Sequence, residues 1–303
     1  MNAVLLPIVI PLAAIALLLF FRSNRLSHIL MITGSSLMLI ASFYLLWKVD
    51  REGIMGLYVG GWEAPYGITL VADLFSVLML IITSFVLLAV SIYKTRFIST
   101  RTGGNRFSIF FFALAMGVNG AFITGDVFNL FVWFELILIS SFVLITYCRE
   151  QSQLHAGIKY MGMNLLGSLF FLAGIGLLYG KTGTLNMAHL ADILRTNGFP
   201  PGINTSAILI FLAFGIKAAV FPLFFWLPAS YPTPNITITA LFAGLLTKVG
   251  VYAMIRFFTL IFIQDQALWH TVFLVVAGLT MLYGGMAAST QYRLQSILSF
   301  HII

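Results

Sequence analysis

The chain has 303 residues, of which 60% are hydrophobic and 8% are charged, with a formal net charge of +7 at pH 7. Because soluble domains carry about 25% charged residues, a chain with so few cannot cover a water-facing surface, and lipid must be its main solvent. The basic residues lie in short segments between apolar runs, without a patch of interleaved aromatic residues, which excludes a nucleic-acid-binding protein.

Apolar segments long enough to cross a membrane follow one another along the whole chain. A spanning helix needs about 20 mostly apolar residues, and the first segment has neither the preceding positive charge nor the cleavage site of a signal peptide. The predicted spans are residues 3–21, 27–47, 70–93, 108–124, 127–147, 157–179, 205–227, 236–260 and 270–289. A last apolar run, residues 294–303, is too short to cross the bilayer, and we expect the chain to be a truncated copy of a longer protein. The prediction is an all-α membrane protein, a polytopic bundle of nine full spanning helices plus a truncated tenth.

The distribution of Lys and Arg over alternate loops predicts the orientation. One set of loops holds Arg22, Arg25, Lys94, Arg96, Arg101, Arg106, Arg149, Lys159 and Arg293. The other set holds Lys48, Arg51, Lys181 and Arg195, together with Asp50, Glu52, Glu63, Asp192 and Asp265. Since cytoplasmic loops carry the excess of positive charge, the first set is predicted to face the cytoplasm and the N-terminus to lie outside. The expected location is the bacterial cytoplasmic membrane.

Two loops are longer than the rest, residues 48–69 and 180–204. The first contains turn residues and interfacial aromatic residues. The second contains Asn186–Asp192, for which we expect a short amphipathic helix on the outer surface. Neither loop is long enough to fold as a soluble catalytic domain.

Three ionisable residues fall in the middle of predicted spans: Glu135, Lys217 and Lys248. Glu135 lies nine residues past Asp126, about 13 Å into the hydrocarbon region at 1.5 Å per residue. Each such charge costs about 2.5–3.5 kcal/mol at the centre of a spanning helix on insertion scales. We therefore expect these groups to face one another or a hydrated cavity.

One explanation of these charges is a buried salt bridge that only helps the bundle to assemble. Two lysines and one carboxylate do not balance, however, so a static pair would leave one lysine charged and without a partner. An unpaired lysine in an apolar interior releases its proton more easily than one in water. The imbalance therefore favours proton transfer.

Pro222 is predicted to break the seventh helix close to Lys217. Proline has no N–H group, so the carbonyl of Ala218 loses its helical partner, and three more prolines follow by residue 234. Broken helices at membrane depth are tolerated where protein or water satisfies the freed backbone. A freed carbonyl beside a titratable lysine suggests part of a cation or proton site, although prolines also occur as plain kinks.

Other ionisable residues are weaker, auxiliary candidates. Asp73 and Asp126 each open a predicted helix, where a carboxylate can simply stabilise the helix dipole; this interpretation is favoured for Asp126 and left open for Asp73. Arg256 lies near a helix end and is expected to extend to the interface. His155 and His189 lie near opposite faces. The favoured interpretation of each is a surface histidine, and the alternative is a point where protons enter or leave.

The sequence contains no Gly-rich phosphate loop, no Cys/His cluster for zinc or iron–sulfur, and no pair of haem-ligating histidines. The single cysteine, Cys148, excludes an internal disulfide. We therefore predict no catalytic residues, no metal site and no cofactor in this chain.

Three segments of the chain carry a family resemblance. They are GDVFNLFVWFELILISSFVLI, KYMGMNLLGSLFFLAGIGLLYGKTGTLNMAHLA and FGIKAAVFPLFFWLPASYPTPNITITALFAGLLTKVGVYAMIR. They resemble the antiporter-like membrane subunits of respiratory complex I and of Mrp multisubunit sodium/proton antiporters, and FPLFFWLPASYPTP is most similar to the D-type branch of the Mrp antiporters. Complex I relatives often have histidines where this chain has Phe224 and Ala229-Ser230-Tyr231, so no role is transferred for them.

The resemblance implies that Glu135 and Lys217 form a coupled pair and that Lys248 passes protons along a central hydrated axis. It also implies a division into N-terminal helices, residues 1–107, and a proton-translocating core, residues 108–303. The expected function is that of a transporter subunit, not an enzyme, which exchanges Na⁺ for H⁺ together with other membrane subunits. The alternatives are a proton-pumping membrane subunit of an NADH dehydrogenase or hydrogenase complex, and a scaffold that moves no ion.

Overall fold

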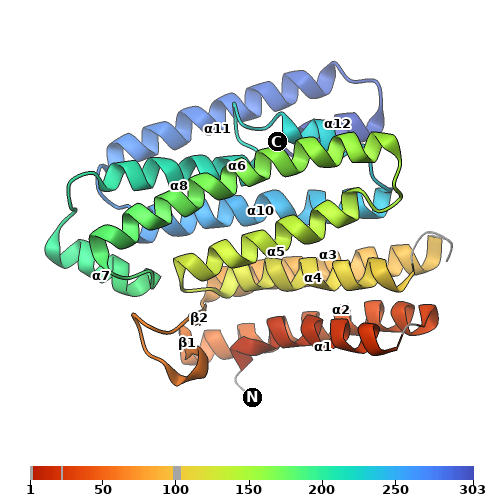
Figure 1. The fold of residues 1–303 in the computed structure, drawn as a ribbon, viewed down its shortest axis with the longest axis horizontal. Helices are drawn as coiled ribbons and strands as arrows, with labels where there is room; N and C mark the ends of the chain where they lie inside the picture. The colour runs from red at the N-terminus through yellow and green to blue at the C-terminus, as the bar shows by residue number, and fades with distance from the viewer. Residues whose placement is uncertain (1–2, 22, 98–103) are drawn as a thin grey trace.

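The computed structural model describes residues 3–21, 23–97 and 104–303 as a bundle of long helices that run side by side (Figure 1). Arg22 and Arg101, two of the basic residues in the predicted cytoplasmic loops, and the side chain of Arg96 lie outside the described part. The elements in chain order are η1 (Ala3–Leu5), α1 (Leu6–Phe20), α2 (Asn24–Glu52), β1 (Met55–Tyr58), η2 (Val59–Gly61), β2 (Thr69–Ala72), α3 (Leu74–Phe97), α4 (Asn105–Ile123), α5 (Val127–Ile145), α6 (Gln151–Thr182), α7 (Met187–Asn197), α8 (Ile203–Ala218), α9 (Trp226–Ser230), α10 (Ile236–Leu260), α11 (Gln266–Ser289) and α12 (Leu294–His301).

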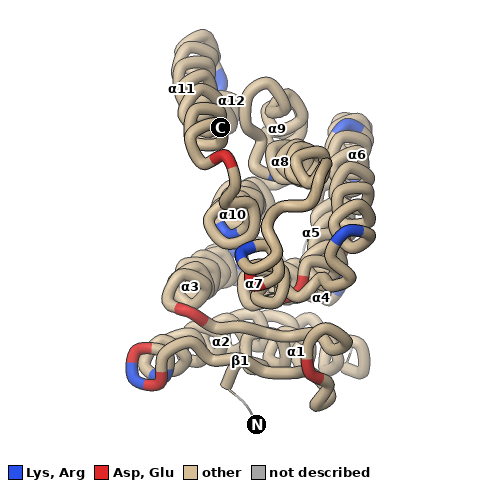
Figure 2. Tube along the Cα trace, turned by 90° about the vertical axis from the view of Figure 1, so that its left-hand side faces the viewer, with Lys and Arg blue, Asp and Glu red and all other residues tan. Residues whose placement is uncertain are grey.

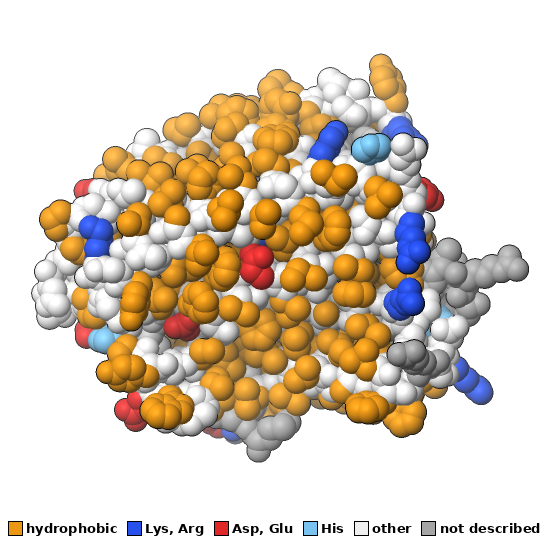
Figure 3. Space-filling model, in the orientation of Figure 1, with side chains coloured by type: hydrophobic (Ala, Val, Ile, Leu, Met, Phe, Trp, Pro, Cys, Tyr) orange, Lys and Arg blue, Asp and Glu red, His pale blue; other side chains and the backbone are white. Residues whose placement is uncertain are grey.

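The outside of the bundle is apolar, as expected for a protein in a membrane. Large hydrophobic side chains are exposed on most of the long helices, among them Ile40, Phe85, Leu169 and Leu274. On the face drawn in Figure 3 they cover the middle, while most of the visible Lys and Arg lie at the right-hand end. A hydrophobic surface of this extent is covered by lipid or by a partner protein in the native state.

Within the described residues, eight helices are long and apolar enough to cross a membrane. They correspond to eight of the nine predicted spans, with bounds that differ by a few residues, most of all at the charged ends of α2 and α6. The predicted seventh span, residues 205–227, is the exception, because its first part is the shorter helix α8 and its last part belongs to α9. The run from residue 294 forms α12, which has 8 residues.

The all-α prediction needs a correction in the loop between α2 and α3. Strands β1 and β2 form an antiparallel hairpin, with Met55 opposite Ala72 and Tyr58 opposite Thr69. Residues 70–72, predicted as the start of the third span, are therefore in β2, and α3 begins at Leu74. Gly60 and Gly61, with φ values of 71° and 78°, allow the chain to turn back after β1.

The hairpin, the α4–α5 turn and α7 lie at the same end of the bundle and are bonded to one another. The backbone N–H of Gly125 donates to the carbonyl of Thr69 at 2.8 Å, and that of Met187 donates to the carbonyl of Gly125 at 2.8 Å. Figure 2 views this end, with α7 beside the ends of α4 and α10. We call it the hairpin end. It contains the predicted short helix after Asn186, whose side chain caps α7.

Serine hydroxyl pairs join the first helices to their neighbours. Ser35 and Ser42 of α2 bond Ser91 and Ser84 of α3 at 3.0 and 3.2 Å. Small hydroxyl residues let helices approach closely and bond across the interface in a membrane, where packing and hydrogen bonds replace the hydrophobic effect. These pairs fix α2 against α3.

The core between α5, α6, α8 and α10 is aromatic. Phe214 of α8 packs against Phe171 of α6 and Phe257 of α10, with ring centroids 4.9 Å apart in both pairs. Phe134 of α5 meets Phe214 at 5.9 Å. Edge-to-face pairs of this kind add to the burial of apolar area. The cluster holds together the helices that carry Glu135, Lys217 and Lys248.

Candidate functional site

The α8 helix ends one residue after Lys217, so Lys217 lies in the last turn of a helix and not in the middle of a continuous one. Ala219 then adopts a left-handed conformation, with φ at 58°, and residues 219–225 are not helical. Pro222, the residue predicted to break the helix, lies inside this segment. A proline at position 222 would allow a helix to continue to Phe221, so α8 ends three residues earlier than this proline alone requires.

Two side-chain hydrogen bonds hold this non-helical segment in place. The indole N–H of Trp226 donates to the carbonyl of Ile216 at 3.0 Å. The backbone N–H of Phe221 donates to the hydroxyl of Thr280, on α11, at 2.9 Å. Backbone groups at membrane depth need such partners because lipid offers none. These bonds anchor the segment to the preceding helix and to α11.

Lys217 projects into a small cavity of about 20 Å³. A cavity of that size has room for about one water molecule. Its lining includes Tyr160 and Asn164 of α6 and Trp226 of α9. The Lys217 Nζ lies 5.6 Å from the centre of the Phe134 ring, a distance at which a cation and an aromatic face attract. The ammonium group thus has an aromatic and largely dry environment.

Glu135 lies on α5, half-buried, and its carboxylate accepts a hydrogen bond from the hydroxyl of Ser168 on α6. Ion pairs among the described residues join Lys48 to Glu52 and Arg256 to Asp73. Glu135 and Lys217 therefore occupy neighbouring helices without direct contact between their charged atoms. The two charged groups form no ion pair in this conformation, and the coupling between them stays a prediction.

Lys248 lies in the middle of α10 and is partly buried. Its Nζ donates to the carbonyl of Ala243 at 2.7 Å and to the hydroxyl of Thr247 at 3.2 Å, both on its own helix. The side chain thus points back toward the start of α10, away from the hairpin end. Its charge is met by neutral oxygen atoms.

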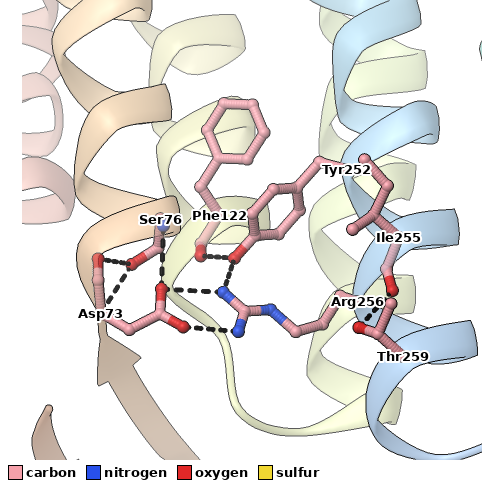
Figure 4. A network of polar contacts seen from close by, with 7 residues as sticks. All are labelled: Asp73, Ser76, Phe122, Tyr252, Ile255, Arg256 and Thr259. Atoms are coloured by element: carbon pink, nitrogen blue, oxygen red, sulfur yellow. Dashed lines mark hydrogen bonds and ion pairs between the residues drawn. The ribbon is translucent and has the colours of Figure 1, made fainter.

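Asp73 and Arg256 form an ion pair that the sequence did not predict (Figure 4). The two guanidinium nitrogens of Arg256 lie 2.5 and 2.8 Å from the two carboxylate oxygens of Asp73, and Arg256 also donates to the hydroxyl of Tyr252 at 2.7 Å. The Tyr252 hydroxyl donates to the carbonyl of Phe122 at 2.7 Å. The expectation that Arg256 extends to the interface was wrong, because a carboxylate lies within reach inside the bundle.

Asp73 also caps α3, since its carboxylate accepts the backbone N–H of Ser76 at 2.8 Å. Burial raises the pKa of the Asp73 carboxyl, but the hydrogen bonds from Arg256 and Ser76 and the charge of Arg256 outweigh burial and hold this pKa below its ordinary value. Asp73 is therefore ionised at neutral pH in this conformation. Both interpretations left open for it, helix capping and a further role, remain compatible with the geometry.

Asp126 caps α5 by accepting the backbone N–H of Asn129 at 2.7 Å, as its favoured interpretation predicts. Burial raises the pKa of the Asp126 carboxyl above its ordinary value, and the backbone hydrogen bonds offset this only in part. His155 is exposed on α6, and the Nδ1 of His189 on α7 lies 3.2 Å from the hydroxyl of Thr184. Neither histidine contacts the three central residues.

Sequence reasoning missed three contributors to these sites: Tyr252, Trp226 and Thr280. The spacing of four residues between Lys248, Tyr252 and Arg256 is a signal that was available, because such residues share a face of a helix. Trp226 and Thr280 contact backbone groups near Pro222 from other elements of the fold. Only the tertiary structure reveals those contacts.

The fold and the ionisable side chains between its helices define a multi-pass membrane protein. A family model described as NADH:quinone oxidoreductase/Mrp antiporter, TM matches residues 124–302. The chain therefore belongs to this family of membrane subunits, and the resemblance carried by its motifs is confirmed.

The D-type subunit of the Na⁺/H⁺ antiporter of Alkalihalophilus pseudofirmus is 44% identical over 305 residues, which cover 100% of this chain and 62% of that protein. The fold is similar to a chain in the Mrp complex from Dietzia, with a TM-score of 0.88 and 32% identity, covering 99% of this chain and 56% of that one. It is also similar to a chain of an archaeal respiratory complex, the membrane-bound sulfane sulfur reductase, with a TM-score of 0.92 and 28% identity, covering 99% and 62%. The chain thus spans about three-fifths of the length of these relatives.

Proposed function

We propose that this chain is a subunit of a multisubunit antiporter that exchanges Na⁺ for H⁺ across the cytoplasmic membrane. Protons pass through Glu135, Lys217 and Lys248, and other membrane subunits complete the complex. The proposal follows the names of its relatives, a D-type subunit of an Na⁺/H⁺ antiporter and a chain of an Mrp complex. It requires no cofactor and no metal in this chain.

The observation that carries the proposal is the position of Lys217. A lysine in the last turn of α8, beside a non-helical segment and in a cavity with room for about one water molecule, is poorly solvated. A static structural ion pair would hold a carboxylate against it, yet Glu135 is bonded to Ser168 instead. A proton relay needs one state in which the carboxylate of Glu135 and the ammonium group of Lys217 are not bonded to each other.

The proton step alternates between two arrangements. When Glu135 approaches Lys217, the opposite charge keeps the lysine protonated. When the two move further apart, the ammonium loses the support of this opposite charge and its proton passes through water toward Lys248. Motion of residues 219–225 is the switch, since this segment follows Lys217 directly and is held to α11 by one side-chain hydrogen bond.

The proposal includes a membrane arrangement. The α8–α9 region forms a ninth, proline-broken crossing in addition to the eight continuous helices, and the N-terminus and the hairpin end face the outside. The basic residues at the opposite end support this orientation by the positive-inside rule. Residues 1–107 form the N-terminal helices, and residues 108–303 form the first half of the proton-translocating core.

A redox-driven proton pump is the second candidate, and one observation favours it. The chain superposes on a chain of an archaeal respiratory complex with a TM-score of 0.92. In that case the same residues would move protons, but a redox arm would drive them. Electron-donor-dependent acidification of vesicles without any response to Na⁺ would support the pump.

The deciding experiment uses inverted vesicles from cells that lack their own antiporters and carry the complete complex. A respiratory pH gradient is formed, Na⁺ is added, and the loss of the gradient is followed for the native complex, Lys217→Ala and Lys159→Ala. Lys159 is exposed on α6 and serves as the matched control. A native gel reports on assembly in each case.

We expect the native and Lys159→Ala complexes to respond to Na⁺ and the assembled Lys217→Ala complex to lose at least tenfold in rate. An equal response of all three would show that Lys217 is structural and would overturn the proton path. Absence of a Na⁺ response in the native complex would overturn the antiporter in favour of the pump.

A further inference from the structure

A pocket of about 370 Å³ at the hairpin end lies apart from the site around Lys217. Its walls come from the β1–β2 hairpin, the α4–α5 turn, α7 and the last turns of α10. The pocket has room for several water molecules. It leads to the network of Asp73, Arg256 and Tyr252, which also belong to its lining.

The ion pair at this pocket is only partly shielded from water. The side chains of Arg256 and Asp73 keep 23% and 18% of their surface exposed, whereas Tyr252, deeper in the bundle, keeps 4%. Asp73 thus lies where water in the pocket can reach its carboxylate. Tyr252 lines the inner part of the pocket and is almost fully buried.

Arg256 and Tyr252 connect the pocket with the helix that carries Lys248. Lys248, Tyr252 and Arg256 follow one another at intervals of four residues on α10 and so lie along one side of this helix. At 1.5 Å per residue, the distance along the helix axis from the Cα of Lys248 to the Cα of Arg256 is about 12 Å. Arg256 bonds the Tyr252 hydroxyl directly.

We propose that Asp73 is a proton-binding residue at the outer pocket, and that Arg256 and Tyr252 link its proton occupancy to that of Lys248. The inference rests on the proposed function, because it assigns a group through which that function meets the outer solution. It gives the chain a site, formed by α3 and α10, at which protons from the outer solution bind. Glu135 and Lys217 are separate from this site.

The step is a protonation of Asp73 in a conformation in which its ion pair with Arg256 has opened, because the paired carboxylate is ionised at neutral pH. A proton from water in the pocket then binds one carboxylate oxygen of Asp73, and the carboxyl becomes neutral. The Arg256 guanidinium keeps its proton and its bond to the Tyr252 hydroxyl, because arginine is not deprotonated in proteins. The region therefore gains one positive charge, which disfavours a proton on Lys248. Proton uptake outside thus promotes proton release from Lys248.

Among the titratable groups that line the pocket, the Asp73 carboxylate is the one to which we assign proton binding. Among the described residues, the titratable side chains that line the pocket are Tyr58, Asp73, Tyr252 and Arg256. The two tyrosines contribute hydroxyl groups that donate and accept hydrogen bonds, and arginine stays charged. The α4–α5 turn and α7 contribute neutral residues, among them Thr124 and Asn186.

The test is the double variant Asp73→Asn/Arg256→Gln in the complete complex. It keeps hydrogen-bonding side chains of similar size but removes both charges, so a pair that only clamps α3 to α10 would be largely preserved. The control, Lys48→Gln/Glu52→Gln, removes an exposed ion pair of 3.5 Å on α2. Na⁺-dependent loss of the pH gradient is measured in inverted vesicles over a series of internal pH values, with assembly checked on a native gel.

We expect the control to match the native complex. In the Asp73/Arg256 double variant, the rate of Na⁺-dependent loss of the pH gradient should fall at least tenfold, or this rate should no longer depend on internal pH. Native rate and native pH dependence in the double variant would overturn the inference. If the double variant does not assemble, Asp73→Glu decides, since it keeps a carboxylate at a changed distance from Arg256. A shifted pH optimum supports the inference, and an unchanged optimum overturns it.

The native complex and Lys217→Ala in the same vesicles report on the proposed function independently. If the native complex shows no Na⁺ response, infrared difference spectra of the purified complex still test proton binding at Asp73. The band of a protonated carboxyl that appears on acidification should be smaller in Asp73→Asn than in the native complex. Identical bands in both would overturn the inference.

Discussion

Gly250 of α10 lies directly against the backbone of Lys217 and Ala218 at the end of α8. A methyl group on Gly250 would come within 2.8 Å of the Lys217 carbonyl carbon and 2.5 Å of the Ala218 nitrogen. Real Cβ atoms do not approach backbone atoms this closely, so any side chain here would push the two helices apart. The helix that carries Lys248 thus touches the helix that carries Lys217 at the site itself.

Gly250→Ala is therefore expected to destabilise the complex and to slow exchange. Overpacking of this kind costs about 1–3 kcal/mol, and the displaced α8 end would misplace Lys217. The measurement is the midpoint of thermal dissociation of the purified complex, together with the Na⁺-dependent rate. Gly278→Ala on α11 is the control, because nothing lies within 4 Å of a Cβ there. Equal midpoints for the two variants would contradict the close contact.

Trp226→Phe tests the anchoring of the non-helical segment. The variant keeps an aromatic ring but removes the indole N–H that donates to the carbonyl of Ile216 at 3.0 Å. Loss of this buried bond and of part of the ring volume should lower stability by about 1–3 kcal/mol. Trp62, which is 69% exposed, provides the control Trp62→Phe, expected to leave the dissociation midpoint unchanged. A midpoint for Trp226→Phe equal to that of the control would argue against an anchoring role.

Glu135→Gln and Ser168→Ala separate the charge of the carboxylate from its hydrogen bond. Glu135→Gln removes the charge and should reduce exchange at least tenfold. Ser168→Ala removes one donor to the carboxylate, and a hydrogen bond to a charged group contributes about 1.5–3 kcal/mol. The charge itself remains, so the rate should fall less than in Glu135→Gln. Rates are compared in vesicles with equal amounts of assembled complex. Glu63→Gln, in the exposed loop, should behave as native, and a native rate for Glu135→Gln would remove this residue from the path.

Arg256→Gln should raise the pKa of Asp73. Burial raises this pKa and Arg256 helps to lower it, so without the guanidinium the effect of burial has less to oppose it. In the native chain the lowered pKa means that the ion pair contributes its full stability above the unfolded-state pKa, near 3.9, and loses it as the pH falls through the lowered value. The native pair thus persists at neutral pH.

In Arg256→Gln the protonated carboxyl should appear at higher pH in infrared titrations of the purified complex. Arg195→Gln, an exposed arginine on α7, should titrate like the native complex. If Arg256→Gln titrates like the native complex as well, Arg256 does not control the Asp73 carboxyl.

Much of the architecture follows from composition and periodicity. In the part of the chain that the structure describes, eight continuous helices appear where apolar runs of spanning length were predicted, because a backbone in lipid must satisfy its hydrogen bonds within the segment. The short helix after Asn186 was also predicted. The hairpin was not, since strands of four residues carry too little alternation to be recognised before their pairing is known.

The candidate site was predicted in part. Glu135, Lys217 and Lys248 stand out in the sequence because charges are rare in apolar runs. Their contacts do not stand out: Ser168 lies 33 residues from Glu135, and Asp73 lies 183 residues from Arg256. Arg256 near a helix end looks like an interfacial residue until the position of α3 is known.

The sequence alone determined that this protein resides in lipid, which apolar segments are long enough to cross a membrane, which family the chain belongs to and which ionisable residues fall inside those segments. The tertiary structure alone decided that α8 stops at Ala218, that Gly250 brings α10 against that end, and that Asp73 and Arg256 meet at the pocket of the hairpin end. The physical reason is that hydropathy and helix periodicity are local properties of the chain. Close approach, hydrogen bonding and ion pairing depend instead on which distant segments pack side by side.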